Sequence, residues 1–364
     1  MPYPDQFEGF MINELGKYKE FKKQEFKPKK FGDNDVDIKI ECCGVCGSDV
    51  HTITGGWGDA PTPICVGHEV VGKVVKVGSK VTTLKEGDRA GVGAQIWSCL
   101  KCQNCKADNE NYCPHMVDTY GAPYPKDVDP DETISQGGYS SHIRAHEYFV
   151  FPIPDEIPSH LAAPMLCAGL TVWSPLTRAG VGPGKQVAIV GLGGLGHFAV
   201  MWANALGAEV TVISHSPSKK DDALKLGAKN FVLSSEEGWS KPLAFKFDFV
   251  LNTADMTHTF NIDNYLSILK VNCQFHQVGL PDKPLPAMQP QQFMPNGSSI
   301  GASHIGNRPE CLAMLKLSAE KKLFPMVETI PISAEGCAEA IERVKNNKVK
   351  YRFTLTDFDK QFSA

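Results

Sequence analysis

The stretch QVAIVGLGGLGHFAVMWANALG, residues 186–207, gives the clearest indication of the fold of the central part of the chain. An apolar strand-like run is followed by a glycine-rich turn and an amphipathic helical pattern, which is the context of a dinucleotide-binding fingerprint. We expect Gly191 to permit the tight turn, Gly193 to let the backbone approach a pyrophosphate, and Gly196 to allow close helix packing. The competing interpretation is a glycine-rich turn that binds no ligand. The predicted cofactor-binding loop comprises Gly191, Leu192, Gly193, Gly194, Leu195 and Gly196, with N–H groups of the following helix as anion donors.

The rest of the central region repeats this alternation of strands and helices. Apolar runs recur at EVTVIS (209–214), NFVLS (230–234), FDFVLNT (247–253) and CQFHQVG (273–279), separated by helical patterns such as DDALKLG. Such alternation is typical of a parallel sheet with crossover helices. We therefore predict a doubly wound, Rossmann-type domain at residues 158–296.

The residues on either side of this domain have a different pattern. Residues 1–157 contain short alternating runs broken by Gly and Pro, which indicate an irregular β-rich domain. Residues 297–364 keep two helical runs and the strand-like YRFTL but lose the tight alternation. We expect this last segment to return to the first domain. The predicted fold class is α/β plus β, with a β-rich domain built from both chain ends around the Rossmann-type domain.

The end of the second strand of this domain indicates which dinucleotide is bound. An NAD site usually places an acid there, which accepts hydrogen bonds from the ribose 2'-hydroxyl. Here the strand ends at Ser214, followed by His215, Ser216 and Lys219, with no carboxylate before Asp221. Hydroxyls and cations suit a 2'-phosphate, so these four residues predict NADP(H). An exposed polar turn that binds nothing is the alternative.

Composition narrows the classes of partner. The chain has 364 residues, 42% of them hydrophobic, and a formal net charge of -4. No basic excess is available for a phosphate backbone, so nucleic acid is not an expected partner. No stretch approaches the roughly 20 apolar residues of a membrane span, and the start MPYPDQFEGF does not resemble a signal peptide. We expect a cytoplasmic protein without membrane attachment, and the uneven clustering of its 12 cysteines indicates metal thiolates rather than a disulfide framework.

Four cysteines cluster in CLKCQNCKADNENYC, with two, two and seven intervening residues. Such a short loop can fold its thiolates into a tetrahedron, and a zinc ion with four sulfur ligands has no position left for substrate. We predict a structural zinc site. An iron–sulfur cluster uses similar spacings and is the competing interpretation, while four unrelated buried thiols are the other. The predicted ligands are Cys99, Cys102, Cys105 and Cys113.

A second group of residues suits a catalytic zinc, which needs three protein ligands and one exchangeable position. The candidates are Cys46 in GVCGSDVH, His68 in VGHEV and Cys167 in APMLCAGL. Each alone is consistent with an ordinary core thiol or a loop histidine. Glu69 directly follows the histidine and is predicted to occupy the fourth position when substrate is absent, or else to be a structural acid. Asp49 is predicted to accept a hydrogen bond from the ligand imidazole.

Two polar residues beside this group are predicted to move a proton. An alkoxide in a dry site must exchange its proton with solvent, which calls for a hydroxyl near the metal and a histidine nearer water. Ser48 and His51 fit these roles. A turn hydroxyl and a surface histidine are the alternatives.

Taken together, ECCGVCGSDVH, VGHEVVGKVVKVG, GDRAGVGA, the four-cysteine lobe, QGGYSSH and GLGGLG make the chain similar to the zinc-dependent medium-chain alcohol dehydrogenases. Within them GAQIWSCLKCQNC, LCAGLTVWSPL and KVKYRFTL resemble the cinnamyl alcohol dehydrogenase branch, especially the broad-specificity NADP-dependent fungal enzymes. The resemblance spans essentially the whole chain. It departs from the branch at His215, where plant members usually have serine and fungal members arginine, and at a longer segment near 127–136.

The resemblance implies a GroES-like catalytic domain, a Rossmann domain and a homodimer. It also implies residues near the cofactor and lining the substrate pocket. The implied cofactor residues are Thr171, Thr253, Ser303 and Ile305, with His304 between the last two; the implied pocket residues are Trp57, Trp97, Met116 and Tyr120.

The predicted function is reversible hydride transfer between NADP(H) and a primary alcohol or aldehyde, aromatic (such as cinnamyl) or aliphatic, with two zinc ions per chain. A zinc-dependent polyol dehydrogenase is a second hypothesis, although the acid usual in its NAD site is missing. A non-catalytic NADPH-binding protein is a third.

Overall fold

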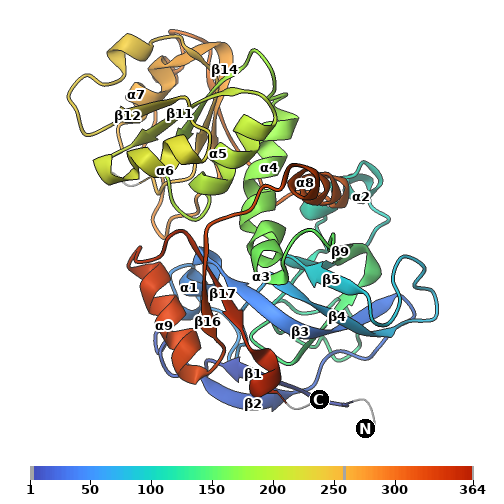
Figure 1. The fold of residues 1–364 in the computed structure, drawn as a ribbon. Coiled ribbons are helices and arrows are strands. Elements are labelled where there is room, and N and C mark those ends of the chain that lie inside the picture. Colours follow the sequence, from blue (N-terminus) through green and yellow to red (C-terminus); the bar gives the residue numbers. More distant parts are fainter. Residues whose placement is uncertain (1–3, 257–259, 363–364) are drawn as a thin grey trace. The chain divides into compact units, whose positions relative to one another are not determined.

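The computed structural model describes residues 4–256 and 260–362 and falls into two compact units (Figure 1). One unit joins Met1–Cys167 to Asn307–Ala364, and the other is Ala168–Gly306. Both chain ends therefore belong to the same unit. None of the helices in the described ranges is long and apolar enough to span a bilayer.

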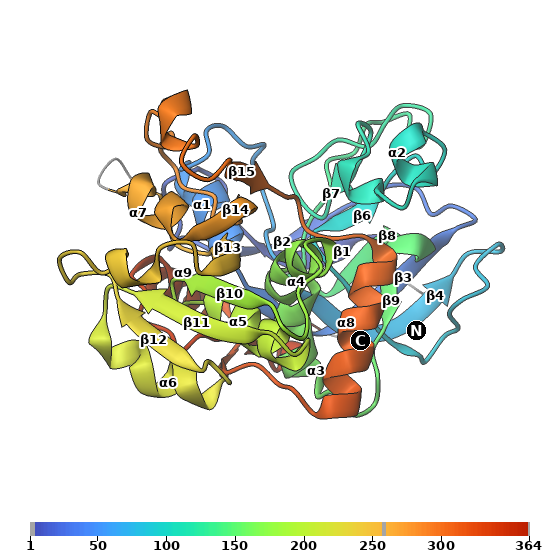
Figure 2. The ribbon, with the colours of Figure 1, turned by 90° about the horizontal axis from the view of Figure 1, so that it is seen from above.

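The unit at 168–306 is built on a six-stranded sheet in which every neighbouring pair is parallel, in the order β12-β11-β10-β13-β14-β15. The strands β12, β11 and β10 lie side by side in Figure 2. Its central strands are buried because crossover helices cover both faces of such a sheet. The strands are β10 (Gln186–Val190), β11 (Glu209–Ser214), β12 (Asn230–Leu233), β13 (Phe247–Asn252), β14 (Leu269–Gln277) and β15 (Ser299–Ala302), and the helices are α4 (Ala168–Arg178), α5 (Gly196–Ala205), α6 (Lys220–Lys225) and α7 (Ile262–Ser267).

Aromatic packing fixes the helix that follows the glycine loop. The indole of Trp202 on α5 is fully buried and meets the ring of Trp173 on α4 edge to face at 5.9 Å. Its Nε1 donates to the carbonyl of Gly169 at 3.2 Å. The apolar face expected from the helical pattern therefore holds α5 against α4.

The other unit contains a seven-stranded sheet in the order β16-β17-β3-β4-β5-β9, with β8 also paired to β3. Segments from both chain ends meet in it, because Phe353 on β17 pairs with Val45 on β3. Its strands are β3 (Asp35–Val45), β4 (Val70–Val77), β5 (Arg89–Val92), β8 (His142–His146), β9 (Val150–Pro152), β16 (Val327–Pro331) and β17 (Arg352–Thr356). The smaller ribbons are β1 (Phe7–Met11) with β2 (Lys22–Phe26) and β6 (Gln95–Trp97) with β7 (Val117–Asp118), and the helices are α1 (Gly47–Thr54), α2 (Gln103–Lys106), α3 (Ser159–Ala162), α8 (Arg308–Lys321) and α9 (Ala334–Lys345).

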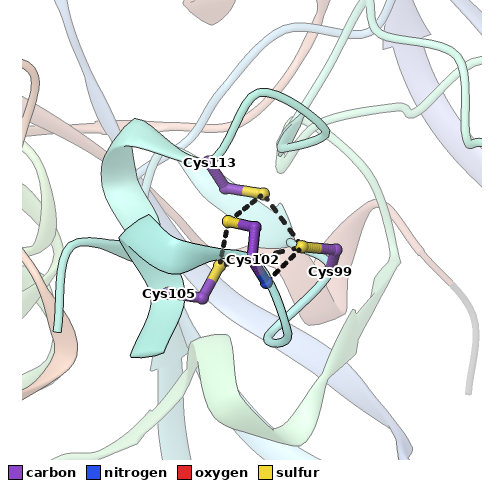
Figure 3. Close-up of side chains that lie close together, drawn as sticks. All are labelled: Cys99, Cys102, Cys105 and Cys113. Carbon is purple, nitrogen blue, oxygen red and sulfur yellow. Dashed lines mark hydrogen bonds between the residues drawn. The ribbon is translucent and has the colours of Figure 1, made fainter. Parts of the chain in front are cut away.

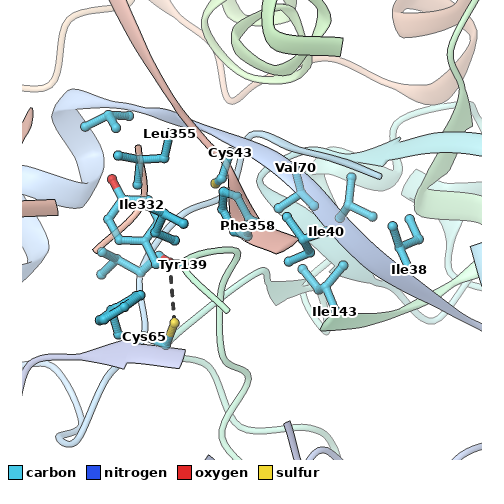
Figure 4. Packing of buried hydrophobic residues seen from close by; sticks show 14 of the residues in the cluster. Ile38, Ile40, Cys43, Cys65, Val70, Tyr139, Ile143, Ile332, Leu355 and Phe358 are labelled. Atoms are coloured by element: carbon cyan, nitrogen blue, oxygen red, sulfur yellow. Dashed lines mark hydrogen bonds between the residues drawn. The ribbon is translucent and has the colours of Figure 1, made fainter. Parts of the chain in front are cut away.

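The core of this unit is continuous across the sheet (Figure 4). Ile38 and Ile40 alternate along β3 and are buried with Val70 of β4, Ile143 of β8 and Leu355 of β17. This alternation is the period-two pattern that the sequence shows in its first domain. The buried sheet fixes the end of β3 and the start of β4, and residues of the candidate metal site lie next to both.

The limits of the central unit, Ala168 and Gly306, lie later along the chain than the limits of 157/158 and 296/297 expected from the sequence. Residues 159–166 form α3 and a 3-10 segment that belong to the first unit. The strand β15 lies beyond residue 296 and pairs with β14, so the parallel sheet extends further than expected. Its sequence, SIGA, is too short and too rich in small residues to show strand periodicity.

Candidate metal centres and cofactor loop

The structure brings Cys46, His68, Glu69 and Cys167 into one buried cluster, with one ligand atom from each within 4.8 Å of the others. The Nε2 of His68 lies 3.2 Å from the Sγ of Cys167. Cys46 follows β3 and forms the N-cap of α1, while His68 and Glu69 directly precede β4. Because β3 and β4 are antiparallel neighbours, paired at Cys43 and Val70, residues about twenty positions apart converge at one end of the sheet.

Asp49 fixes the orientation of the histidine in this cluster. Its Oδ1 lies 3.0 Å from Nδ1 of His68 and accepts the backbone N–H of Gly67 at 3.1 Å. Its Oδ2 accepts the backbone N–H of Cys46 at 2.9 Å. With Nδ1–H held by the carboxylate, the Nε2 lone pair faces the thiols, which is the arrangement expected of a histidine that binds a metal.

Arg352 on β17 is a residue of this site that the sequence analysis missed. Its guanidinium donates to Oε1 of Glu69, and both side chains are buried. The other oxygen, Oε2 of Glu69, has no hydrogen-bond partner among the described residues. Burial raises the pKa of Glu69 to about 7, although Arg352 opposes that rise. The two residues are 283 positions apart, and no local pattern in the sequence links them.

The donor set of this cluster fits a zinc ion. Tetrahedral geometry with ordinary Zn–S and Zn–N lengths separates a sulfur and a nitrogen ligand by roughly 3.6 Å, close to the observed separation of His68 and Cys167. The neighbouring Cys167 thiol holds the pKa of Cys46 well below its ordinary value, which favours a thiolate. The Oε2 of Glu69, which has no hydrogen-bond partner among the described residues, is an oxygen donor available beside the two sulfurs and the nitrogen.

The four-cysteine lobe forms the second cluster (Figure 3). The Sγ separations are 3.5 Å for Cys99–Cys113 and Cys102–Cys105, 3.9 Å for Cys102–Cys113, and 4.0 Å for Cys99–Cys105. Four sulfurs around one zinc ion lie roughly 3.8 Å apart, whereas a disulfide needs about 2.0 Å. The spacing fits a single ion better than an iron–sulfur cluster, in which sulfurs bound to different irons are further separated.

Backbone donors and a neighbouring helix hold the lobe in place. The N–H of Cys102 points to the sulfur of Cys99 at 3.4 Å, which stabilises a thiolate. The backbone N–H of Arg308, the first residue of α8, donates to Oε1 of Glu110 at 2.5 Å, and Nδ2 of Asn307 donates to the carbonyl of Asp108 at 2.7 Å. The lobe therefore anchors the start of α8.

The expected proton-transfer residues both lie on α1. The Oγ of Ser48 lies 3.7 Å from Sγ of Cys46, and His51 is one helical turn further along. Positions three apart share a helix face. The His51 imidazole stacks on the indole of Trp57. Tyr120, another expected pocket residue, has its ring 5.6 Å from that of His68, whereas Trp97 and Met116 are half-buried on and beside the β6–β7 ribbon.

The glycine loop in the other unit has the form that a pyrophosphate requires. Gly191 follows β10 with φ +85°, in the left-handed region. A Cβ on Gly196 would lie 2.2 Å from the carbonyl oxygen of Gly191, so only glycine fits there. A Cβ on Gly193 would meet nothing within 4 Å, so the loop presents open space at that residue. The loop therefore matches the three glycine roles expected from the sequence.

The end of β11 carries the residues predicted to face a 2'-phosphate. Ser214 is buried, and its Oγ accepts the backbone N–H of Ser216 at 3.3 Å. His215 is exposed and Lys219 is half-buried in the turn that leads to α6. The first acid after the strand, Asp221, already belongs to α6.

The remaining cofactor candidates occupy separate elements of this unit. Thr253 follows β13 and its Oγ1 donates to the carbonyl of Val190 at 2.9 Å, which ties it to the glycine loop. Ser303 follows β15, and its Oγ lies 2.9 Å from Nε2 of His276 on β14, a partner not foreseen from the sequence. Ile305 is buried with φ +51°, and Thr171 is half-buried on α4. Strands β10, β13 and β15 are parallel members of one sheet, so Gly191, Thr253 and Ser303 all follow its carboxyl edge, where dinucleotides bind.

Comparisons with known proteins agree with these sites. Residues 32–155 match the alcohol dehydrogenase GroES-like domain, and residues 194–320 match the zinc-binding dehydrogenase family. The chain is 46% identical to NADP-dependent alcohol dehydrogenase 6 of Saccharomyces cerevisiae. The alignment spans 366 positions and covers 100% of both proteins. Among solved structures it resembles a cinnamyl alcohol dehydrogenase of Sorghum bicolor (TM-score 0.89, 37% identity, 96% and 97% of the two chains) and one of Helicobacter pylori solved with NADP(H) (TM-score 0.86, 32% identity, 96% and 98%).

Two matched domains and a relative aligned over its whole length establish the class. The chain belongs to the zinc-dependent medium-chain alcohol dehydrogenases and is an oxidoreductase with a GroES-like and a Rossmann domain. The sequence predictions of family, fold class, enzyme class and zinc are therefore confirmed.

Proposed function

We propose that the chain catalyses the reversible reaction of a primary alcohol with NADP⁺ to give an aldehyde, NADPH and a proton. The observation that carries the proposal is the buried cluster of Cys46, His68 and Cys167 with the free Oε2 of Glu69 beside it. The yeast relative, named an NADP-dependent alcohol dehydrogenase, supports the same chemistry.

In this proposal the cluster holds the catalytic zinc. A bound zinc ion supplies Lewis acidity, which polarises a carbonyl and lowers the pKa of an alcohol. Cys46 and Cys167 offer two negative charges that offset the dication, and His68 is held in the binding tautomer by Asp49. Glu69, paired with Arg352, would offer its Oε2 to the exchangeable position of the metal.

Ser48 and His51 move the proton that alcohol oxidation releases. The Oγ of Ser48, next to the ligand Cys46, accepts the alcohol proton and passes its own outward. His51, at the last turn of α1, delivers the proton to solvent. In aldehyde reduction the same groups carry a proton inward, which balances the hydride delivered to the carbonyl carbon.

The Rossmann domain holds the cofactor. Bound NADP(H) exchanges a hydride at its nicotinamide ring. The backbone at Gly191–Gly196 would hold the pyrophosphate, and Ser214, His215, Ser216 and Lys219 would hold the 2'-phosphate. Thr171 and Thr253 would lie near the cofactor, and Ser303 and Ile305 near its nicotinamide ring.

The substrate proposed is a primary alcohol or its aldehyde, aromatic or aliphatic. Trp57, Trp97, Met116 and Tyr120 supply a predominantly apolar lining, which suits a cinnamyl or other apolar chain better than a polyol. The names of the sorghum and Helicobacter pylori relatives support an aromatic substrate.

The compartment proposed is the reducing cytoplasm, because metal thiolates such as those of both clusters persist there.

A homodimer completes the proposal. β15 is the last strand of the six-stranded sheet, and an unpaired strand edge is a template for a second chain. Large apolar side chains are exposed in the segment between β14 and β15, with Leu280 58% and Met294 76% exposed. Sedimentation of the purified chain as a monomer at micromolar concentration would contradict this arrangement.

The test of the function is a turnover panel combined with metal analysis. Purified protein should contain about two zinc ions per chain, one for each ligand cluster. It should oxidise NADPH far faster than NADH with cinnamaldehyde and aliphatic aldehydes. Turnover of mannitol with NADP⁺, without turnover of aldehydes, would replace the proposal by a polyol dehydrogenase. No turnover with either cofactor would leave a non-catalytic cofactor-binding protein.

A further inference from the structure

The helix that carries the proton-transfer residues ends in a glycine turn of defined shape. Gly55 caps α1 in the left-handed conformation, φ +74°, and its N–H points to the carbonyls of His51 and Thr52. The N–H of Gly56 donates to the carbonyl of His51 at 2.8 Å, and the N–H of Gly58 donates to Gly55 at 3.2 Å. These bonds reverse the chain immediately after the helix, so the residue at the tip of the turn returns toward the last turn of α1.

That residue is Trp57, whose indole lies flat against the imidazole of His51. The ring centroids are 4.9 Å apart, and the planes differ by 11°. The indole is 43% exposed, so its placement is not forced by burial in the core. An offset parallel stack of this kind is a favourable aromatic geometry, and it limits rotation of the imidazole about its side-chain bonds.

We propose that Trp57 is a positioning residue for proton transfer, which holds the imidazole of His51 in the orientation that receives the proton on one nitrogen and releases it on the other. The inference rests on the proposed role of His51. Loss of the stack removes one contact that restricts the half-buried imidazole of His51, and only some rotamers of this side chain are productive. Loss of alignment at a transfer step costs rate even when the group that carries the proton is retained.

The role differs from that of a residue that only lines the substrate pocket. A lining residue changes the KM of the aldehyde according to the shape of the aldehyde. A positioning residue changes kcat for every aldehyde alike, requires His51 for its effect, and is replaced by another flat ring. Trp57→Leu removes the ring and Trp57→Phe keeps one, so the two substitutions separate these roles.

The first measurement is a magnetic resonance spectrum of the imidazole C–H groups in the zinc-loaded enzyme, assigned with His51→Gln. The stacked indole shields the His51 protons, so Trp57→Leu should move these signals downfield while Trp57→Phe retains part of the shielding. Phe245→Leu, which removes an exposed ring in the other unit, is the control and should leave them unchanged. Unchanged His51 signals in Trp57→Leu would show that the indole does not stack on the imidazole in solution.

The second measurement is a double-mutant cycle on NADPH-dependent aldehyde reduction. Trp57→Leu should lower kcat by several-fold to about 100-fold for every aldehyde, in addition to any change in KM that follows from its place in the proposed pocket lining, and Trp57→Phe should recover most of the lost kcat. In the His51→Gln background, Trp57→Leu should lower kcat no further. An equal loss in both backgrounds, or a change confined to KM, would overturn the positioning role while leaving the relay intact. A normal kcat in His51→Gln alone would overturn the relay and the positioning role together.

Discussion

The carboxylate of Asp49 joins two ligands of the catalytic cluster, with Oδ1 3.0 Å from Nδ1 of His68 and Oδ2 accepting the backbone N–H of Cys46 at 2.9 Å. One buried side chain thus sets the histidine tautomer and the start of α1. It links the residue that follows β3 to the residues that precede β4.

Asp49→Asn should weaken zinc binding at this centre by about 10-fold to 100-fold, since an amide cannot accept at both of its atoms. Zinc retained per chain after dialysis against a chelator measures the effect, with Asp127→Asn on an exposed loop as the matched control. Zinc retention equal to that of the unsubstituted protein would show that Asp49 does not support the ligand set.

Arg352→Met should destabilise the catalytic unit by about 3 to 5 kcal/mol, because it leaves the carboxylate of Glu69 buried without its partner. Adding Glu69→Gln to this variant should recover part of the loss, since a neutral amide is less costly to bury. The midpoint of denaturant unfolding, followed in the zinc-loaded protein, checks both changes. Equal destabilisation in the single and double variants would contradict the pairing.

Substitution of two glycines of the cofactor loop by alanine should have different effects, one on stability and the other on cofactor binding. Gly196→Ala places a Cβ against the Gly191 carbonyl and should lower stability with or without cofactor. Gly193→Ala meets no protein atom, so it should leave the unfolding midpoint nearly unchanged and raise the KM of NADPH. Thermal unfolding with and without NADPH, together with initial rates, distinguishes them. An unchanged KM in Gly193→Ala would place the pyrophosphate elsewhere.

The four-cysteine lobe should matter for stability rather than for chemistry. Cys105→Ser should release one zinc ion per chain and loosen the contacts between the lobe and the start of α8. Amide hydrogen exchange should then increase at residues 99–113 and at the first turn of α8. Full zinc content with unchanged exchange would contradict a structural metal at this lobe.

Acid should destabilise the Rossmann domain through His276. Burial lowers the pKa of His276 from 6.5 to about 4, so below pH 6.5 the unfolded chain binds a proton that the folded chain does not. Stability is therefore lost as the pH falls from about 6.5 to 4, with a slope of up to about 1.4 kcal/mol per pH unit from this residue. His276→Gln should flatten that slope in unfolding curves at pH 4.5 to 7. An unchanged slope would mean that His276 is protonated in the folded chain.

Much of this organisation is predictable from local sequence. Runs such as QVAIV and EVTVIS locate β10 and β11 because fully buried parallel strands are continuously apolar. The four-cysteine lobe is equally direct, since all of its ligands lie within fifteen residues. β15 was not predicted because a run of only four residues, Ser299–Ala302, carries no periodicity, and its place in the sheet comes from pairing with β14.

Pairings between distant residues are what the sequence did not indicate. Arg352 begins an ordinary strand-like run, and only the antiparallel pairing of β17 with β3 brings it to Glu69. The contact between His276 and Ser303 depends in the same way on the register of β14 against β15. The stack of Trp57 on His51 requires the turn geometry of Gly55 and Gly58, which a glycine-rich motif permits but does not specify.

The most direct test of the central claim is the fate of the hydride when cinnamaldehyde is reduced with NADPH deuterated at the transferable position of C4. Hydride transfer at this centre predicts one deuterium at C1 of the alcohol product. Cys167→Ala should abolish this transfer and lose the zinc of the catalytic cluster. Alcohol formed without the label, or labelled equally fast by Cys167→Ala, would contradict hydride transfer at the Cys46–His68–Cys167 centre.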